Sequence, residues 1–192
     1  MSINQIARRR WEKVAAGTLA LAIGVSLAGG AMAANTVRTT VTAGTRTASI
    51  ANLNLGNVAY SHASVAKAGA MKLSADDSSG TNLGWSVTVL ASDFAYSGAY
   101  SGSAIAASNF GITSAANPVR NAGQAVDLTN GPIVPLISPV GSLDVARKVV
   151  AANAGWGKGD YDQNLDVSLN VPADTLVGTY TSTLTVTITA GP

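Results

Sequence analysis

Several short stretches of the chain alternate apolar and polar residues, which is the pattern of a strand with one buried and one exposed face. Three of them are residues 70–75, 85–91 and 165–171. A short polar stretch rich in Asp, Ser and Gly joins the first two, and this arrangement predicts a β-hairpin. The pattern therefore indicates a fold built from antiparallel strands.

The end of the chain carries the most regular alternation. Every second residue from Thr179 to Thr189 is threonine, and Leu184, Val186 and Ile188 lie between the later ones. Threonine is β-branched and polar, so it suits the exposed face of a strand. We expect an 11-residue strand about 35 Å long, with Leu184, Val186 and Ile188 facing the core. It would form a second hairpin with the strand that precedes it.

The middle of the chain is less periodic. Residues 110–113 predict a short strand, residues 131–141 contain three prolines and predict an edge strand or an extended loop, and residues 143–155 fit a strand or a short helical turn. No stretch of ten residues shows a clear helical period. The chain is therefore expected to be all-β, with a single β-sandwich or related Greek-key domain.

The beginning of the chain has the features of a secretory signal peptide. Arg8, Arg9 and Arg10 precede a long apolar run, and Ala31-Met32-Ala33 fits an A-x-A cleavage site. We expect residues 1–33 to be removed after export, residues 34–49 to form a Thr-rich lead or first strand, and residues 50–192 to form the domain. An uncleaved membrane anchor is the alternative, which the many Gly and Ala residues and the cleavage site oppose.

Removal of the signal peptide changes the charge of the protein. Four of the 12 basic residues and one of the 10 acidic residues lie within it, so the remainder has a net charge of −1. Such a chain has neither the basic surface expected for nucleic-acid binding nor a polybasic segment for anionic membranes. The chain has no cysteine, so its stability must come from its core and sheets rather than from disulfides.

Catalytic motifs are not evident in the sequence. The only histidine is His62, no nucleophile elbow or P-loop is present, and His and Cys do not supply the ligands of a zinc site. We therefore expect a protein that is not an enzyme and needs no cofactor.

Three closely spaced carboxylates, Asp160, Asp162 and Asp166, are weak candidates for calcium binding. Counted from Asp160, however, Leu165 and Val171 occupy the positions where an EF-hand needs glycine and a bidentate acid. We expect a solvated polar loop before a strand here, so metal binding is not the favoured interpretation.

Two tryptophans follow the signal peptide. Trp85 lies on the apolar face of an expected strand, which favours core packing. Trp156 lies between two glycines, which suits either packing or stacking on a sugar or a partner. Asp77 lies at an expected turn.

The segments DDSSGTNLGWSVTVLASDF and LNVPADTLVGTYTSTLTVTITAGP resemble the WxL family of bacterial cell-surface domains. The matching residues are Asp77, Gly80, Gly84, Trp85, Val87, Val171, Pro172, Ala173, Gly178, Tyr180, Leu184 and Pro192. Three departures are Val87 in place of the leucine of the first motif, Val186-Thr187-Ile188 in place of the second W-x-L, and Ser79 where the family often has arginine. The resemblance implies an exported β-rich domain that attaches non-covalently to peptidoglycan. The ligand-binding candidates in the chain are Trp156, Trp85 and Asp77.

Two functions follow from these features. The first is a secreted, non-enzymatic protein at the extracellular cell surface, associated with the wall through peptidoglycan or other surface proteins. No sorting motif follows the final strand, so we expect non-covalent attachment. The second is a subunit of a surface filament, a homo-oligomer in which the segment 34–49 pairs with an open sheet edge of a neighbouring copy.

Overall fold

The computed structural model describes residues 37–136 and 140–192. The expected signal peptide, residues 1–33, lies outside the described residues. Contacts divide the chain into two units, residues 1–40 and 41–192, and the fold below is that of the second unit.

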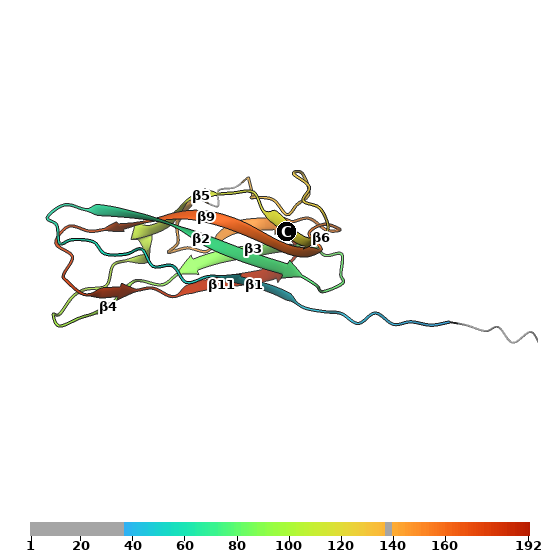
Figure 1. Cartoon of the computed structure of the whole chain (residues 1–192), viewed down its shortest axis with the longest axis horizontal. Helices are drawn as coiled ribbons and strands as arrows, with labels where there is room; N and C mark the ends of the chain where they lie inside the picture. The colour runs from blue at the N-terminus through green and yellow to red at the C-terminus, as the bar shows by residue number, and fades with distance from the viewer. Residues whose placement is uncertain (1–36, 137–139) are drawn as a thin grey trace, which may run out of the picture. The chain divides into compact units, whose positions relative to one another are not determined.

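The described part of the chain contains eleven strands, and Figure 1 shows how the longer ones lie beside one another. The larger sheet contains β1 (Arg46–Ile50), β2 (Val65–Asp77), β9 (Gly159–Val171), β5 (Phe110–Ala115) and β7 (Gly141–Ser142) in this order, and β6 (Val119–Gly123) also pairs with β9. The second sheet has the order β11 (Leu184–Ala190), β3 (Trp85–Ala91) and β8 (Arg147–Ala152). The short strands β4 (Ala95–Ser97) and β10 (Thr179–Thr181) pair with each other.

All these strand pairs are antiparallel, and the sheets pack together around one apolar core. The only helical turn in residues 37–136 and 140–192 is a 3₁₀ turn at Ala107–Asn109, and none of these residues forms a helix long and apolar enough to cross a membrane. The prediction of an all-β sandwich is confirmed.

The core follows the alternation seen in the sequence. Along β2, Met71 and Leu73 are almost completely buried, and Leu165 and Val167 on β9 are equally inaccessible. Val89 on β3 packs into the same cluster from the second sheet. Burial of these side chains supplies the main favourable free energy of a domain that has no disulfide.

The two expected hairpins are wrong. β2 belongs to the larger sheet and β3 to the second sheet, and β9 and β11 are separated in the same way. The main partner of β2 is β9, along 13 residue pairs from Val65↔Val171 to Asp77↔Gly159. The polar segments that follow β2 and β9 therefore carry the chain from one sheet to the other.

The last strand is interrupted, although its faces were predicted correctly. β10 ends at Thr181 and β11 begins at Leu184. Between them the chain is held by Ser92, whose backbone N–H donates to the Thr183 carbonyl at 3.0 Å and whose hydroxyl accepts from the Thr183 N–H at 2.9 Å. Leu184, Val186 and Ile188 pack partly buried against the core, whereas the six alternating threonines are exposed.

Three ambiguous segments are resolved by the structure. The expected short strand at 110–113 is present as β5, and residues 147–152 form β8 rather than a helical turn. In the described part of the proline-containing segment, Ile133 makes an isolated bridge to Ala151, and only the last residue, Gly141, enters a strand, the edge strand β7. The end of the segment 34–49 enters β1 and pairs with β2 of its own chain, whereas residues 37–45 form no strand.

Candidate functional site

Trp156 lies in the loop 153–158, which connects β8 to β9. The segments 78–84 and 124–131 lie beside it, because the Gly155 N–H donates to the Asn82 carbonyl at 2.9 Å and the Asn153 N–H donates to the Asn130 carbonyl at 2.8 Å. We call these three segments the loop end of the domain. The ring of Trp156 is half-buried there.

Trp85 supports this loop from the core. Its side chain is completely buried, and its indole N–H donates to the Gly157 carbonyl at 2.7 Å. Gly157 has φ +74°, and a Cβ at this position would lie 2.7 Å from the indole nitrogen. Glycine is therefore required by both the backbone conformation and the close approach of the indole. Trp85 acts on the loop but is not accessible to a ligand.

Gln124 and Tyr161 hold the same loop from its other side. The Gln124 side chain donates to the Gly155 carbonyl at 3.3 Å and accepts from the Lys158 N–H at 3.3 Å. The Tyr161 hydroxyl donates to the Gln124 carbonyl at 2.7 Å. Burial raises the pKa of Tyr161, so the hydroxyl keeps its proton and remains a donor. The backbone around Trp156 is thus fixed at several points.

Asp77, the third ligand-binding candidate from the sequence, is buried. Its carboxylate forms an ion pair of 3.1 Å with Arg46 and accepts hydrogen bonds from the backbone and the hydroxyl of Ser79. These contacts connect the beginning of β1 to the turn after β2. Asp77 is placed to hold this turn rather than to reach a ligand.

The three candidate calcium ligands lie on β9 rather than in a loop. Asp160 and Asp166 are six residues apart on an extended strand, so their Cα atoms are about 20 Å apart and cannot share one ion. Asp162 forms an ion pair of 2.7 Å with Lys72 and accepts a hydrogen bond from Ser74 at 2.6 Å. The hydrogen bonds from Lys72 and then Ser74 lower the pKa of Asp162 to about 2. In residues 37–136 and 140–192, no group of three or more His, Cys, Asp or Glu side chains could hold a metal.

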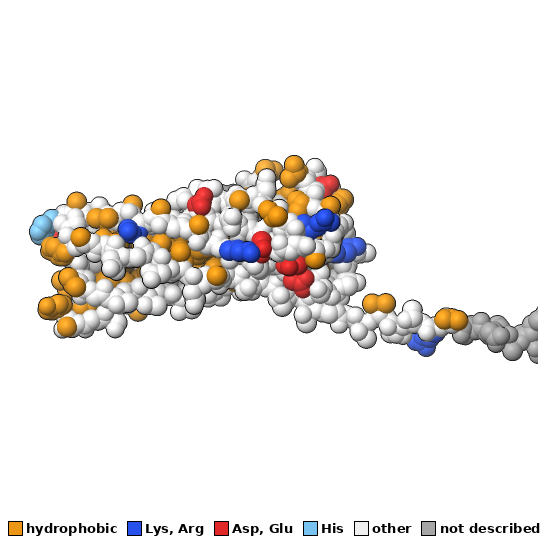
Figure 2. All heavy atoms as spheres, viewed as in Figure 1, with side chains coloured by type: hydrophobic (Ala, Val, Ile, Leu, Met, Phe, Trp, Pro, Cys, Tyr) orange, Lys and Arg blue, Asp and Glu red, His pale blue; other side chains and the backbone are white. Residues whose placement is uncertain are grey.

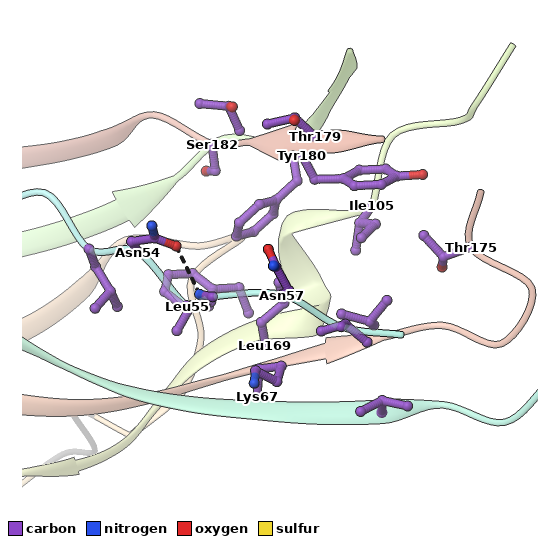
Figure 3. A pocket seen from close by; sticks show the side chains of 18 of the residues that line it. Asn54, Leu55, Asn57, Lys67, Ile105, Leu169, Thr175, Thr179, Tyr180 and Ser182 are labelled. Atoms are coloured by element: carbon purple, nitrogen blue, oxygen red, sulfur yellow. Dashed lines mark hydrogen bonds between the residues drawn. The ribbon is translucent and has the colours of Figure 1, made fainter. Parts of the chain in front are cut away.

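A groove of about 1150 Å³ lies at the opposite end of β2 and β9, and the sequence did not reveal it. The segment 51–61 crosses it between β10 on one side and β2 and β9 on the other (Figure 3). Leu53 and Leu55 of this segment are half-buried, while Asn54 and Asn57 are exposed. The floor of the groove is therefore apolar and its rim polar.

Four of the five tyrosines of the chain lie at this end of the domain. Tyr60 and Tyr180 line the groove; Tyr96 packs against Tyr180 with 5.4 Å between ring centroids, and its hydroxyl accepts from the Tyr100 N–H. Figure 2 shows hydrophobic side chains gathered around His62 at this end. In the sequence, small residues flank each of these tyrosines, and this was the signal available for the cluster. The tyrosines come from distant parts of the chain, so the sequence did not show that they lie together.

Comparison with known families identifies the class of protein to which this domain belongs. The model of the WxL domain, a surface cell wall-binding domain, matches residues 12–192. The chain therefore belongs to the WxL domain surface cell wall-binding family. Searches of curated proteins and of solved structures found no match. As a member of this family, the protein binds the bacterial cell wall non-covalently and is associated with the wall at the cell surface.

Proposed function

We propose that the wall component bound by this protein is peptidoglycan and that Trp156 contacts it. The family establishes wall binding, and the observation that supports the site is the arrangement at the loop end. There a half-buried tryptophan lies on a loop that is held by the side chains of Trp85 on β3, Tyr161 on β9 and Gln124. A large amphipathic ring on a fixed backbone loses little conformational entropy when it binds.

The surroundings of Trp156 suit a sugar surface. A Cβ added at Gly155 would meet no atom within 4 Å, so the space on this side of the loop is open. In the neighbouring segments 78–84 and 124–131, Ser78, Asn82 and Thr129 are exposed and carry hydroxyl or amide groups. Indole stacks on the apolar face of a sugar ring, and the polar groups around it can bind sugar hydroxyls.

The proposed role is binding without catalysis. His62, the only histidine of the chain, contacts the Asp174 carboxylate at 2.6 Å and packs against the edge of Tyr60. All three side chains are on the surface. This arrangement supports a structural surface cluster, and the family is one of wall-binding domains.

Sedimentation with purified sacculi tests the proposal. The sacculi should first be stripped of secondary wall polymers, so that peptidoglycan is the only wall component present. Trp156→Ala should weaken co-sedimentation of the mature chain while leaving its melting temperature nearly unchanged. Leu128→Ala is the matched control, because Leu128 is 75% exposed in a neighbouring segment of the loop end but presents no aromatic ring.

A specific role of Trp156 requires that only the tryptophan variant lose binding. Equal loss in both variants would indicate non-specific adhesion through exposed apolar side chains. Full binding by Trp156→Ala would remove this residue from the site, and a parent chain that binds intact walls but not stripped sacculi would exclude peptidoglycan as the ligand.

A further inference from the structure

We propose that the groove at the tyrosine-rich end is a second peptidoglycan-binding site, which takes a glycan strand of N-acetylated sugars bearing carboxylates. This inference rests on the proposed function, because it assumes that peptidoglycan is the wall ligand. It adds a site that is separate from Trp156 and specifies the chemistry that the site recognises.

The groove matches the two-sided character of a sugar chain. Its floor contains apolar side chains from both sheets, Phe110 and Leu169 from the larger sheet and Val186 from the second. Its rim contains the amides of Asn54 and Asn57 and the hydroxyl of Thr179 (Figure 3). A sugar ring presents apolar C–H faces and a polar edge of hydroxyl and acetamido groups. A site of mixed lining is therefore better suited to a glycan than to a purely apolar ligand.

Backbone groups along the groove are also available to a ligand. Within residues 52–60, one backbone hydrogen bond is present: the Gly56 N–H donates to the side-chain oxygen of Asn54 at 2.8 Å. The segment forms no strand, and its residues are exposed apart from the partly buried Leu53, Leu55 and Val58, so backbone N–H and C=O groups are accessible along it. Acetamido groups carry both a donor and an acceptor, and they can pair with such a backbone.

Two tyrosines are held in place at the groove. The Tyr60 hydroxyl donates to the Asp174 carboxylate at 3.0 Å, and the Tyr180 hydroxyl donates to the Leu176 carbonyl at 2.9 Å. These bonds fix the rings before any ligand arrives, and 53% of the Tyr60 surface remains accessible. A fixed aromatic ring at the rim is placed to stack on a sugar.

Lys67 is the residue that specifies a charged ligand. It is the only charged side chain among the described residues that line the groove, and no carboxylate in the described part of the chain lies within ion-pair distance of it. Carboxylates on the lactyl groups or stem peptides of peptidoglycan could pair with this ammonium group. A neutral oligosaccharide would lack that contact, which makes the contribution of Lys67 measurable.

The two proposed sites lie at opposite ends of β2. Val65 and Lys67 are at the groove, whereas Asp77 leads into the loop end, and the strand between them spans about 40 Å. A glycan contact at one end therefore leaves the other end free. On an insoluble wall with many strands, two weak contacts would act together and increase retention through avidity.

Soluble ligands test the groove without the insoluble wall. The probes are muramidase-released disaccharide peptides, which carry carboxylates, and chitotetraose, which is neutral. Binding to the mature chain is measured by calorimetry and by amide chemical-shift changes in nuclear magnetic resonance. The variants are Lys67→Gln, Tyr60→Ala and Trp156→Ala, and the control is Tyr100→Ala, whose ring is 65% exposed at the same end but does not line the groove.

We expect disaccharide peptides to shift amide signals in the segments 52–61 and 179–183. Lys67→Gln should weaken their binding at the groove by about tenfold and leave the affinity for chitotetraose unchanged. Tyr60→Ala should weaken the binding of both probes, whereas Tyr100→Ala and Trp156→Ala should leave the groove signals as in the parent.

Three results would overturn the inference. Signals that change only around Trp156 would leave one site at the loop end, and Lys67→Gln and Tyr60→Ala chains that bind as the parent does would remove the groove from recognition. Self-association that increases with concentration and is abolished by the groove variants would show that a strand of a second copy occupies it. Sedimentation of the parent chain with sacculi is measured in parallel, so failure of peptidoglycan binding is distinguished from failure of the groove.

Discussion

Replacing Trp85 with phenylalanine tests how the core supports the loop end. The indole N–H donates to the Gly157 carbonyl at 2.7 Å from a completely buried position. Phenylalanine keeps most of the apolar contact but has no donor, and the buried carbonyl would lose this partner at a cost of about 1–3 kcal/mol. The smaller ring adds a cavity cost, so the free energy of unfolding should fall by at least this amount.

Trp85→Ala provides the upper limit for comparison, because removal of a buried tryptophan side chain costs about 3–5 kcal/mol. That is a large fraction of the total of about 5–15 kcal/mol for a typical domain. The assay is denaturant unfolding followed by fluorescence. Trp156 is then the only tryptophan in residues 34–192, so the signal comes from the supported loop itself.

Hydrogen exchange separates loop support from general stability. In Trp85→Phe, the amides of residues 153–158 should exchange faster than expected from the change in global stability. A Trp85→Phe chain with the parent's unfolding free energy and unchanged exchange in this loop would refute the role assigned to the indole N–H.

Three further perturbations have expected outcomes that can be measured by thermal or denaturant unfolding. Gly157→Ala should destabilise the fold by about 1–3 kcal/mol, because the added Cβ would lie 2.5 Å from the Cβ of Ala152. Gly155→Ala should cost only the strain of a positive φ, because no atom lies within 4 Å of its added Cβ. Equal losses of stability in the two variants would contradict the packing argument. Val186→Asp should lower stability by about 1–3 kcal/mol and Thr185→Asp by about 0.5 kcal/mol or less, and a reversed order would show that the inward face of β11 is wrongly assigned. Hydrogen bonds lower the pKa of Asp162 from 3.8 to about 2, so its ionised form stabilises the folded state above about pH 4, and this contribution disappears as the pH falls to about 2. Asp162→Asn should therefore lose less stability than the parent between about pH 4 and about pH 2. An acid-unfolding profile equal to that of the parent would contradict the role given to the Asp162 carboxylate.

The inward faces of the strands could be predicted because side-chain polarity follows their two-residue period. Leu184, Val186 and Ile188 face the core as their alternation indicated. The break between β10 and β11 could not be predicted, since the alternation continues through it. It arises from hydrogen bonds to Ser92, which is 90 residues away from Ser182 in the chain.

The pairing of strands was harder to predict than their faces. A polar turn between two strands fits both a hairpin and a crossing between stacked sheets, because both leave the turn on the surface. The segment after Asp77 makes the crossing, and the sequence pattern does not distinguish the two cases. The start of β9 was mistaken for a loop partly because Gln163 occupies an inward position, where it donates to the carbonyls of Ala116 and Val149.

The functional candidates show a similar limit. Core packing of Trp85 followed from its place on an apolar strand face, but its bond to the loop of Trp156 joins residues 72 positions apart. The groove depends on Tyr60, Lys67 and Tyr180, which come from three separate parts of the chain. Such sites arise from sheet pairing, so they become visible only when the topology is known.

The most direct test of wall attachment is co-sedimentation of the mature chain, residues 34–192, with stripped sacculi before and after muramidase digestion. The protein should pellet with intact sacculi, be recovered at its unmodified mass after extraction with denaturant, and move to the supernatant when the glycan strands are cut. A chain that stays in the supernatant with intact sacculi would contradict peptidoglycan binding. A chain that carries a covalently attached wall fragment after extraction would contradict non-covalent attachment.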